Sequence, residues 1–163
     1  MDYDLTIIGA GWAGFNAALK AKELGLKVCL IEKSQIGGTC LNLGCIPTKT
    51  LIQSAKIYSL AKKSGNFGIE IAAPVANFAK IQERKEKVIQ QLRSGIQFRL
   101  KGIDLINAEA KILSNQEIQA GNQIIKTKFI LIASGSKPIE LNTIKFDAKK
   151  ILSSDDILNL KEI

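Results

Sequence analysis

The chain has 163 residues, with 23 Lys and Arg against 15 Asp and Glu, so its net charge is +8, and it contains no His. This length predicts one folded domain with room for a hydrophobic core, and the absence of His excludes every mechanism that takes an imidazole base or metal ligand from this chain. Three Cys are too few for a secreted fold held by disulfides, so we expect a reducing, cytoplasmic location.

The basic charge is spread along the whole sequence. Its densest stretch is a helix predicted over about 78–101, in which Glu83 and Glu86 interrupt seven Lys and Arg residues. We interpret this stretch as a solvated helix face and expect no nucleic-acid partner. The first four residues carry two acids and no base, and no apolar run approaches the roughly 18 residues of a membrane span. We therefore expect neither a leader segment nor a membrane partner.

A strand, a helix and a second strand are predicted in the first 32 residues. They cover residues 3–8, 12–24 and 27–31. We expect the helix to end at Gly25, because glycine accepts the left-handed backbone that often follows a helix. The stripe that this helix is expected to bury consists of Ala17, Ala21 and Leu24. The strand–helix–strand order predicts a parallel sheet and hence an α/β fold.

Two longer helices are predicted in the middle of the chain. The first begins at Pro47 or just before it and runs to about Lys63, and a turn follows over 64–68. The second covers about 78–101 and ends at Gly102.

The last third of the chain is predicted to return to strands. Short β-like runs separated by polar turns predict a small antiparallel meander at about 103–127. The continuous apolar run 128–133 then predicts a central parallel strand, and a final helical turn is expected near 155–160. Together these elements predict a Rossmann-type parallel sheet with an inserted β-meander.

A GxGxxG motif lies between the first strand and the first helix. Gly9 would make the tight turn, Gly11 would let a pyrophosphate approach the backbone, and Gly14 would let the helix pack close to the strand. The helix N-terminus favours the phosphate charge. Glu32, at the end of the second strand, is placed to accept hydrogen bonds from ribose hydroxyls. The motif predicts a dinucleotide site but does not separate FAD from NAD.

Two cysteines, Cys40 and Cys45, lie five positions apart in a glycine-lined segment after this site. A regular helix would separate them by about 7.5 Å of rise, which is too far for a disulfide. Irregular backbone at Asn42 or Gly44 would bring them together, and a disulfide in a reducing compartment is more often catalytic than structural. The alternative is two unpaired thiols in a loop. Cys29 lies within the second predicted strand, so we expect it to be buried and inert.

The run GGTCLNLGCIPTK over 37–49 resembles the redox-active signature of the flavin-dependent pyridine nucleotide–disulfide oxidoreductases. The resemblance extends over the whole chain, through 133–138 to 153–155. Within the family, the pattern is most similar to that of the dihydrolipoyl dehydrogenases, with Thr48 in place of the commoner Ser.

This resemblance implies roles for individual residues. Cys40 would be the thiol that exchanges with substrate, Cys45 would contact the flavin ring, and Lys49 would reach the flavin near N5. The FAD site would be completed by residues from five segments of the chain: Gly9, Gly11 and Gly14 at the pyrophosphate, Glu32 at the ribose, Lys33, Gly38, Thr39 and Cys40 along the site, Ala110 at the adenine, and Ser134, Gly135 and Ser136 near the phosphates.

The resemblance also implies what the chain is part of. Residues 1–163 would form the N-terminal part of an FAD-binding domain, without the NAD-binding and dimer-interface domains of the family. The full-length enzyme would oxidise dihydrolipoamide to lipoamide through a Cys40–Cys45 disulfide and FAD and pass hydride to NAD, whereas the isolated chain would be inactive. Its partners would be a lipoamide-bearing acyltransferase of the 2-oxo acid dehydrogenase complexes and, as a homodimer, a second copy.

Two alternatives remain open from the sequence. The first is a non-catalytic FAD-binding or interaction module, and the second is a glutathione or mercuric reductase, which differs only in substrate. In addition, we expect an exposed sheet face to be apolar and to pair with another copy of the chain.

Overall fold

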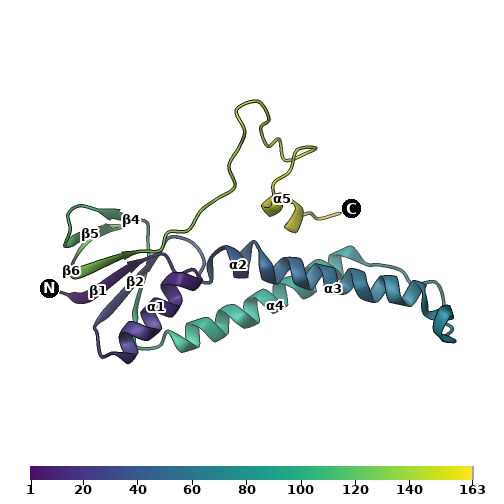
Figure 1. The fold of residues 1–163 in the computed structure, drawn as a ribbon, viewed down its shortest axis with the longest axis horizontal. Helices are drawn as coiled ribbons and strands as arrows, with labels where there is room; N and C mark the ends of the chain where they lie inside the picture. Colours follow the sequence, from purple (N-terminus) through teal and green to yellow (C-terminus); the bar gives the residue numbers. More distant parts are fainter. Residues whose placement is uncertain (163) are drawn as a thin grey trace. The chain divides into compact units, whose positions relative to one another are not determined.

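The structure, a computed structural model, describes residues 1–162 as two compact units. Unit 1 comprises Met1–Asn42 and Leu92–Lys137, and unit 2 comprises Leu43–Gln91 and the chain from Pro138 onward. The elements of both units are labelled in Figure 1.

Unit 1 is built on one six-stranded sheet with the order β3-β2-β1-β6-β5-β4. The first, second and third strands and the second half of the sixth are parallel, whereas the fourth, the fifth and the first half of the sixth are antiparallel. The strands are β1 Tyr3–Ile8, β2 Val28–Glu32, β3 Asp104–Asn107, β4 Ala110–Ile112, β5 Glu117–Ala120 and β6 Gln123–Ile132. The predicted α/β fold with a parallel sheet and a β-meander is therefore confirmed.

The meander is shorter than the sequence indicated. Residues 103–127 were expected to be antiparallel, but β3 pairs in parallel with β2, from Cys29↔Asp104 to Glu32↔Asn107. The antiparallel part starts only at Ala110. A four-residue strand with no clear alternation does not reveal its partner, because pairing is decided by contacts distant in the sequence.

Helix α1 (Trp12–Glu23) covers one face of the sheet, against β1 and β2. It buries Gly14, Phe15, Ala18 and Ala21, so the predicted stripe was partly wrong: Ala21 is buried as predicted, Ala17 is only partly buried, and Leu24 is 67% exposed. The close approach of Gly14 to the strand sets which face turns inward, and apolar spacing alone did not show this. The helix ends as predicted, because Gly25 has φ +80° and the Gly25 and Leu26 amides donate to the carbonyls of Lys22 and Ala21.

The opposite face of the sheet carries the second part of the core. Cys29 and Ile31 pack there with three side chains of the meander, Ile118, Ala120 and Ile125, all of which are buried. Cys29 has no exposed surface, which confirms the prediction of a buried thiol. The meander therefore closes the sheet on this side.

The sixth strand leaves an open edge. It pairs with β5 over Gln123–Lys126 and with β1 over Thr127–Ile132, so among the described residues the outer side of 128–132 has no strand beside it. Phe129 is 68% exposed and Ile132 is 64% exposed on this strand. Phe129 and Ile132 point to opposite faces of this strand, so the edge exposes apolar side chains, whereas an apolar sheet face and its pairing with a second copy stay predictions.

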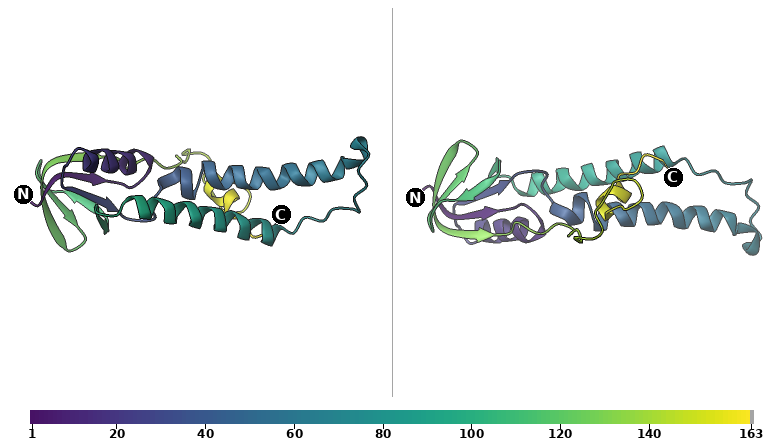
Figure 2. Two further views of the ribbon diagram at one scale, coloured as in Figure 1. Left: turned by 90° about the horizontal axis from the view of Figure 1, so that it is seen from below. Right: turned by 90° about the horizontal axis from the view of Figure 1, so that it is seen from above.

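Helices form most of the secondary structure of unit 2. Helix α3 (Cys45–Lys62) begins two residues before Pro47 and is followed by a 3-10 turn, η1 (Ser64–Phe67). Helix α4 (Phe78–Arg99) starts in unit 2, and its residues from Leu92 belong to unit 1. The short α5 (Ser154–Leu158) lies beside α4 in both views of Figure 2. These bounds agree with the predicted helices.

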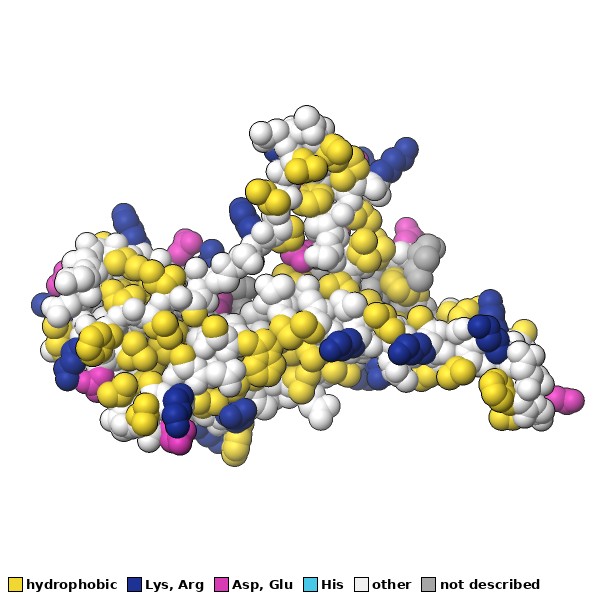
Figure 3. Space-filling model, viewed as in Figure 1, with side chains coloured by type: hydrophobic (Ala, Val, Ile, Leu, Met, Phe, Trp, Pro, Cys, Tyr) yellow, Lys and Arg dark blue, Asp and Glu magenta, His cyan; other side chains and the backbone are white. Residues whose placement is uncertain are grey.

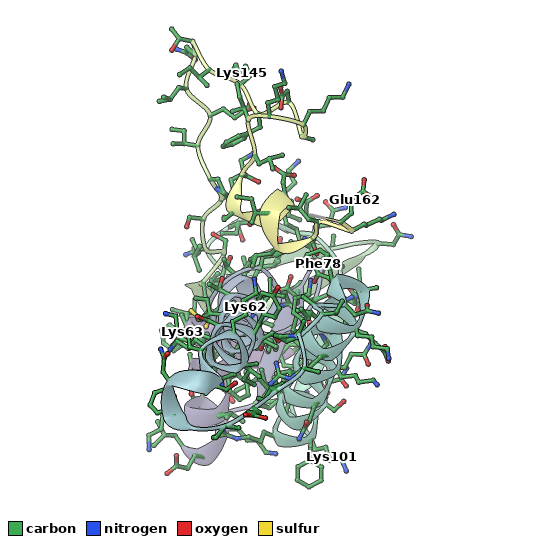
Figure 4. All side chains as sticks on the ribbon, turned by 90° about the vertical axis from the view of Figure 1, so that its right-hand side faces the viewer. Lys62, Lys63, Phe78, Lys101, Lys145 and Glu162 are labelled. Atoms are coloured by element: carbon green, nitrogen blue, oxygen red, sulfur yellow. The ribbon has the colours of Figure 1, made fainter. Side chains whose placement is uncertain are left out.

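Unit 2 has exposed apolar side chains on α3 and an apolar cavity. Figure 3 shows hydrophobic and basic side chains on the exposed surface of α3, where Ile57 is 58% and Leu60 is 62% exposed. Phe78, labelled in Figure 4, lines an apolar cavity of about 520 Å³ together with Tyr58 and Ile157. No helix of the described residues is both long and apolar enough to cross a membrane.

The interpretation of α4 as a solvated basic face was partly wrong. Lys85 is only 3% exposed, and its Nζ donates to the Leu158 carbonyl at 2.7 Å, which holds α5 in place. Arg84 donates to the Thr50 carbonyl, and Arg93 donates to the Asn42 side chain. These contacts could not be predicted from the sequence, because the partners lie 34 to 73 residues away.

Candidate dinucleotide and thiol site

The turn between β1 and α1 leaves no space for side chains at two of its glycines. Gly9 has φ +102°, and a Cβ on it would lie 2.3 Å from the Ala133 carbonyl oxygen. A Cβ on Gly14 would lie 1.8 Å from the Gly9 carbonyl oxygen. The N-cap of α1 is Gly11, which offers no side-chain hydrogen bond, and the first turn contains no acid. The amides at this helix end are therefore available to an anion.

Glu32 ties this turn to the next loop. One of its carboxylate oxygens accepts a hydrogen bond from the Ala10 amide at 2.8 Å, and the other accepts one from the Ser34 amide at 2.8 Å. Each carboxylate oxygen has a second lone pair, so these bonds leave acceptor capacity for ribose hydroxyls. The sequence predicted the ribose contact but not the two backbone contacts, which fix the carboxylate in place.

The larger cavity in unit 1 has a volume of about 410 Å³. It extends from the glycine turn to a cysteine, and its walls come from the turn after β1, the loop and helix after β2, and the loop after β6. Nine of its lining residues are those that the sequence proposed for the cofactor: Gly9, Gly11, Glu32, Gly38, Thr39, Cys40, Ser134, Gly135 and Ser136. The fold thus brings together segments that are up to 127 positions apart, from residue 9 to residue 136.

A smaller cavity of about 200 Å³ shares Gly9, Glu32 and Ser134 with the larger one. Lys33, which was proposed along the FAD site, and Ala110, which was proposed at the adenine, both line it. Lys33 also forms an exposed ion pair of 3.5 Å with Glu109. The two remaining predicted residues line neither cavity, since Gly14 is buried under the turn and Lys49 lies on α3 in unit 2. The role of every one of these residues in binding stays a prediction.

The two cysteines of the signature lie on different helices. Cys40 is partly buried in the five-residue α2 (Gly38–Asn42), and Cys45 is the exposed first residue of α3. The helix is interrupted between them, and Gly44 has the irregular backbone angles φ −148° and ψ −114°. A continuous helix that would hold the two sulfurs apart is therefore absent. Lys49 lies one helical turn after Cys45 and on the same side of α3.

Cys29 differs from these two thiols. It is fully buried, and desolvation together with the Asp104 charge raises its pKa to about 12. A thiol that stays protonated is a poor nucleophile. Cys29 is therefore part of the core and not of the site.

The sequence and fold were compared with known proteins. The family model described as pyridine nucleotide-disulphide oxidoreductase matches residues 3–163. The chain belongs to this family. It is 43% identical to a dihydrolipoyl dehydrogenase of Bacillus subtilis, an alignment that covers 98% of this chain and 36% of that protein. It is 38% identical to a mercuric reductase of Staphylococcus aureus, over 99% of this chain and 30% of the relative.

A solved structure supports the same assignment. The HOCl-induced flavoprotein disulfide reductase RclA of Escherichia coli matches with a TM-score of 0.79 and 31% identity, over 98% of this chain and 34% of that one. The chain thus spans about a third of the length of these proteins. The family to which it belongs consists of flavin-dependent oxidoreductases.

The cavities fit the flavin nucleotide of this family in two respects. Gly9 and Gly11 line the larger cavity without side chains, so the polar main chain of the turn can face a diphosphate. The fixed Glu32 carboxylate stands at the junction of the two cavities, where a sugar hydroxyl would need an acceptor. Glu32 would hold the ribose, and the α1 N-terminus would hold the phosphates.

Four residues that line the larger cavity were not proposed from the sequence: Trp12, Ala13, Gly37 and Ala133. Of these, Gly37 has φ +97°, with its amide donating to the Ala10 carbonyl at 2.8 Å. The position of Trp12 inside the GxGxxG motif was a usable signal. Arg93 donates a hydrogen bond to Asn42, which follows Cys40 by two residues. No pattern in the sequence indicated this pairing, because it depends on how α4 packs.

Proposed function

We propose that this chain is the flavin-binding and dithiol part of an enzyme that oxidises dihydrolipoamide to lipoamide and passes the electrons to NAD. The observation that supports this most directly is the 410 Å³ cavity, which has the dinucleotide turn in one wall and the Cys40 residue in another. The glycine turn proposed for the dinucleotide and the residue proposed for thiol exchange thus line the same cavity. The relatives named dihydrolipoyl dehydrogenase favour this substrate over others.

The proposed reaction is an exchange between two dithiol–disulfide pairs. A substrate thiolate attacks the Cys40 sulfur of a Cys40–Cys45 disulfide, so a mixed disulfide forms and Cys45 leaves as a thiolate. The second substrate thiol then attacks the substrate sulfur in the mixed disulfide, which releases cyclic lipoamide and the Cys40 thiolate. FAD, when bound, would accept the two electrons of the dithiol and deliver them to NAD as hydride.

The residues of this chain would support these steps without acting as the base. Cys45 is the first residue of α3, so a thiolate formed there would lie at the positive end of the helix dipole. Lys49, one turn later, adds positive charge on the same side. The chain contains no His, so a histidine base for the substrate thiols would come from outside residues 1–163.

Partners follow from the same proposal. The enzyme would act on the lipoamide arm of an acyltransferase in a 2-oxo acid dehydrogenase complex and would work as a homodimer in the cytoplasm. A mercuric reductase among the relatives keeps reduction of another substrate as an alternative within the same chemistry.

An assay of the complete gene product tests the substrate. NAD-dependent oxidation of dihydrolipoamide should fall by at least about 1,000-fold when Cys45 is replaced by Ser, because the exchange loses its leaving thiolate. Lys56→Met, an exposed α3 variant, is the control and should keep wild-type activity. Faster reduction of glutathione disulfide or Hg²⁺ than turnover of dihydrolipoamide would replace the proposed substrate.

The non-catalytic alternative has its own test. The 163-residue chain is titrated with FAD, and the emission of Trp12, the single tryptophan, reports binding because Trp12 lines the cavity. The proposal predicts no lipoamide reduction by NADH from this chain alone. Tight FAD binding to the complete gene product without any dithiol turnover would favour a binding module.

A further inference from the structure

Asn42 closes the short helix that carries Cys40. Its side-chain Nδ2 donates to the carbonyls of Gly38 at 3.0 Å and Ile36 at 3.1 Å. These bonds join the last residue of α2 to its first residue and to the loop before it. The geometry of a five-residue helix, too short to be stable alone, is therefore set by one amide side chain.

Arg93 of α4 fixes this amide from the other side. Its Nη2 donates to Asn42 Oδ1 at 2.6 Å, the length of a charge-assisted hydrogen bond. Both residues are half-buried and belong to unit 1. Because Asn42 Nδ2 must face two carbonyl oxygens, the bond from Arg93 to Oδ1 also fixes which way the amide is turned.

A second observation is that the Arg93 side chain carries an energetic cost where it lies. Its Nε is buried and has no hydrogen-bond acceptor among residues 1–162. A buried donor without an acceptor costs free energy, so this position carries a penalty that a solvent-exposed arginine would not have. The bond to Asn42 is the polar contact that Arg93 makes in this setting.

We propose that Arg93 is a positioning residue for the dithiol pair: through Asn42 it holds α2, and with α2 the Cys40 thiol, in the geometry that disulfide exchange needs. This inference rests on the proposed function of Cys40 and Cys45. Arg93 acts through Asn42 and does not itself contact a reacting atom. Removing it should loosen Cys40 and lower the effective concentration of this thiol for Cys45.

The test is a thiol–disulfide equilibrium of the full 163-residue chain with glutathione. Two protein thiols and one glutathione disulfide give one Cys40–Cys45 disulfide and two glutathione thiols, and peptide mapping measures the fraction linked. Arg93→Met should lower this equilibrium constant about 10-fold, which corresponds to about 30 mV. Arg99→Met, which removes the same charge from the same helix near Phe15, should leave the constant within about 2-fold of wild type.

A second variant separates positioning from general destabilisation. Asn42→Ala should lower the constant as Arg93→Met does, and the double variant should be no worse than the worse single one, because both changes remove the same link. Circular dichroism checks that each variant is folded, and an unfolded Arg93→Met is replaced by Arg93→Gln, which also removes the Nη2 donor and should lower the constant in the same direction.

The outcomes distinguish two failures. If the wild-type chain forms no Cys40–Cys45 disulfide at any glutathione ratio, the proposed function fails. If the wild-type disulfide forms normally and Arg93→Met stays within about 2-fold of it, only the positioning role is overturned. An equal loss in Arg99→Met would overturn it as well, because charge rather than the hydrogen bond would then be responsible.

Discussion

Gly14 is the residue at which the dinucleotide turn tolerates least change. A Cβ there would lie 1.8 Å from the Gly9 carbonyl oxygen, which is backbone and cannot move aside. Gly14→Ala should therefore destabilise unit 1 by roughly 3 kcal/mol or more and abolish FAD binding, as urea unfolding and Trp12 emission would show.

Gly95 provides the matched control for this substitution. It lies inside α4, and a Cβ on it would have nothing within 4 Å. Gly95→Ala should stabilise the chain by about 0.5–1 kcal/mol, because alanine loses less backbone entropy in a helix. Equal effects of the two substitutions would contradict the proposed turn geometry.

The Cys29 thiol predicts how stability depends on alkaline pH. Burial raises its pKa from 9.0 to about 12, so the folded state keeps a proton that the unfolded state releases above pH 9. The stabilisation is therefore complete below pH 9 and decreases from pH 9 to 12. Between pH 9 and pH 10, wild type should lose about 1 kcal/mol more of its unfolding free energy than Cys29→Ala in urea titrations. Identical slopes would show that Cys29 titrates normally.

At this residue scale, motif positions could be predicted and side-chain partnerships could not. Glu32, Thr39 and Ser136 could be proposed from the sequence because each lies in a recognisable local motif. In the structure all three line the same cavity. Arg93 lies in no such motif: it is one of seven basic residues in a helix, and only the packing of α4 shows that it reaches Asn42.

At the scale of elements, long helices with clear end signals could be predicted from the sequence, whereas the pairing of a short strand could not. The helices of unit 2 could be predicted to within a few residues, because glycine and proline mark their ends. The partner of β3 could not be predicted, since four residues carry no register information. The buried face of α1 depends on where Gly14 meets the strand, and that is a tertiary contact.

The open edge of β6 makes a prediction at this scale. Among the described residues, the outer side of 128–132 has no neighbouring strand, and Phe129 within this segment is exposed. An open strand edge of this kind can pair with a further strand. The isolated chain should therefore associate with a second copy at high concentration, as sedimentation equilibrium would show. Phe129→Lys should shift the protein to monomer, whereas Phe98→Lys on α4, where Phe98 is equally 68% exposed, should not. A wild-type chain that remains monomeric at millimolar concentration would exclude this pairing.

At the scale of the whole molecule, the two units divide the chemistry between them. The dinucleotide turn and Cys40 belong to unit 1, and Cys45 and Lys49 belong to unit 2. The break in the helix at Leu43 and Gly44 lies where the chain passes from one unit to the other.

We propose that Cys40 and Cys45 form a redox pair in which Cys29 takes no part. To test this, the purified 163-residue chain is oxidised with lipoamide and alkylated, and its peptides are mapped by mass spectrometry without reduction. A redox pair should give one Cys40–Cys45 linked species that dihydrolipoamide reverses, with Cys29 unmodified until the chain is unfolded. Independent alkylation of Cys40 and Cys45 after oxidation, or a disulfide that includes Cys29, would contradict it.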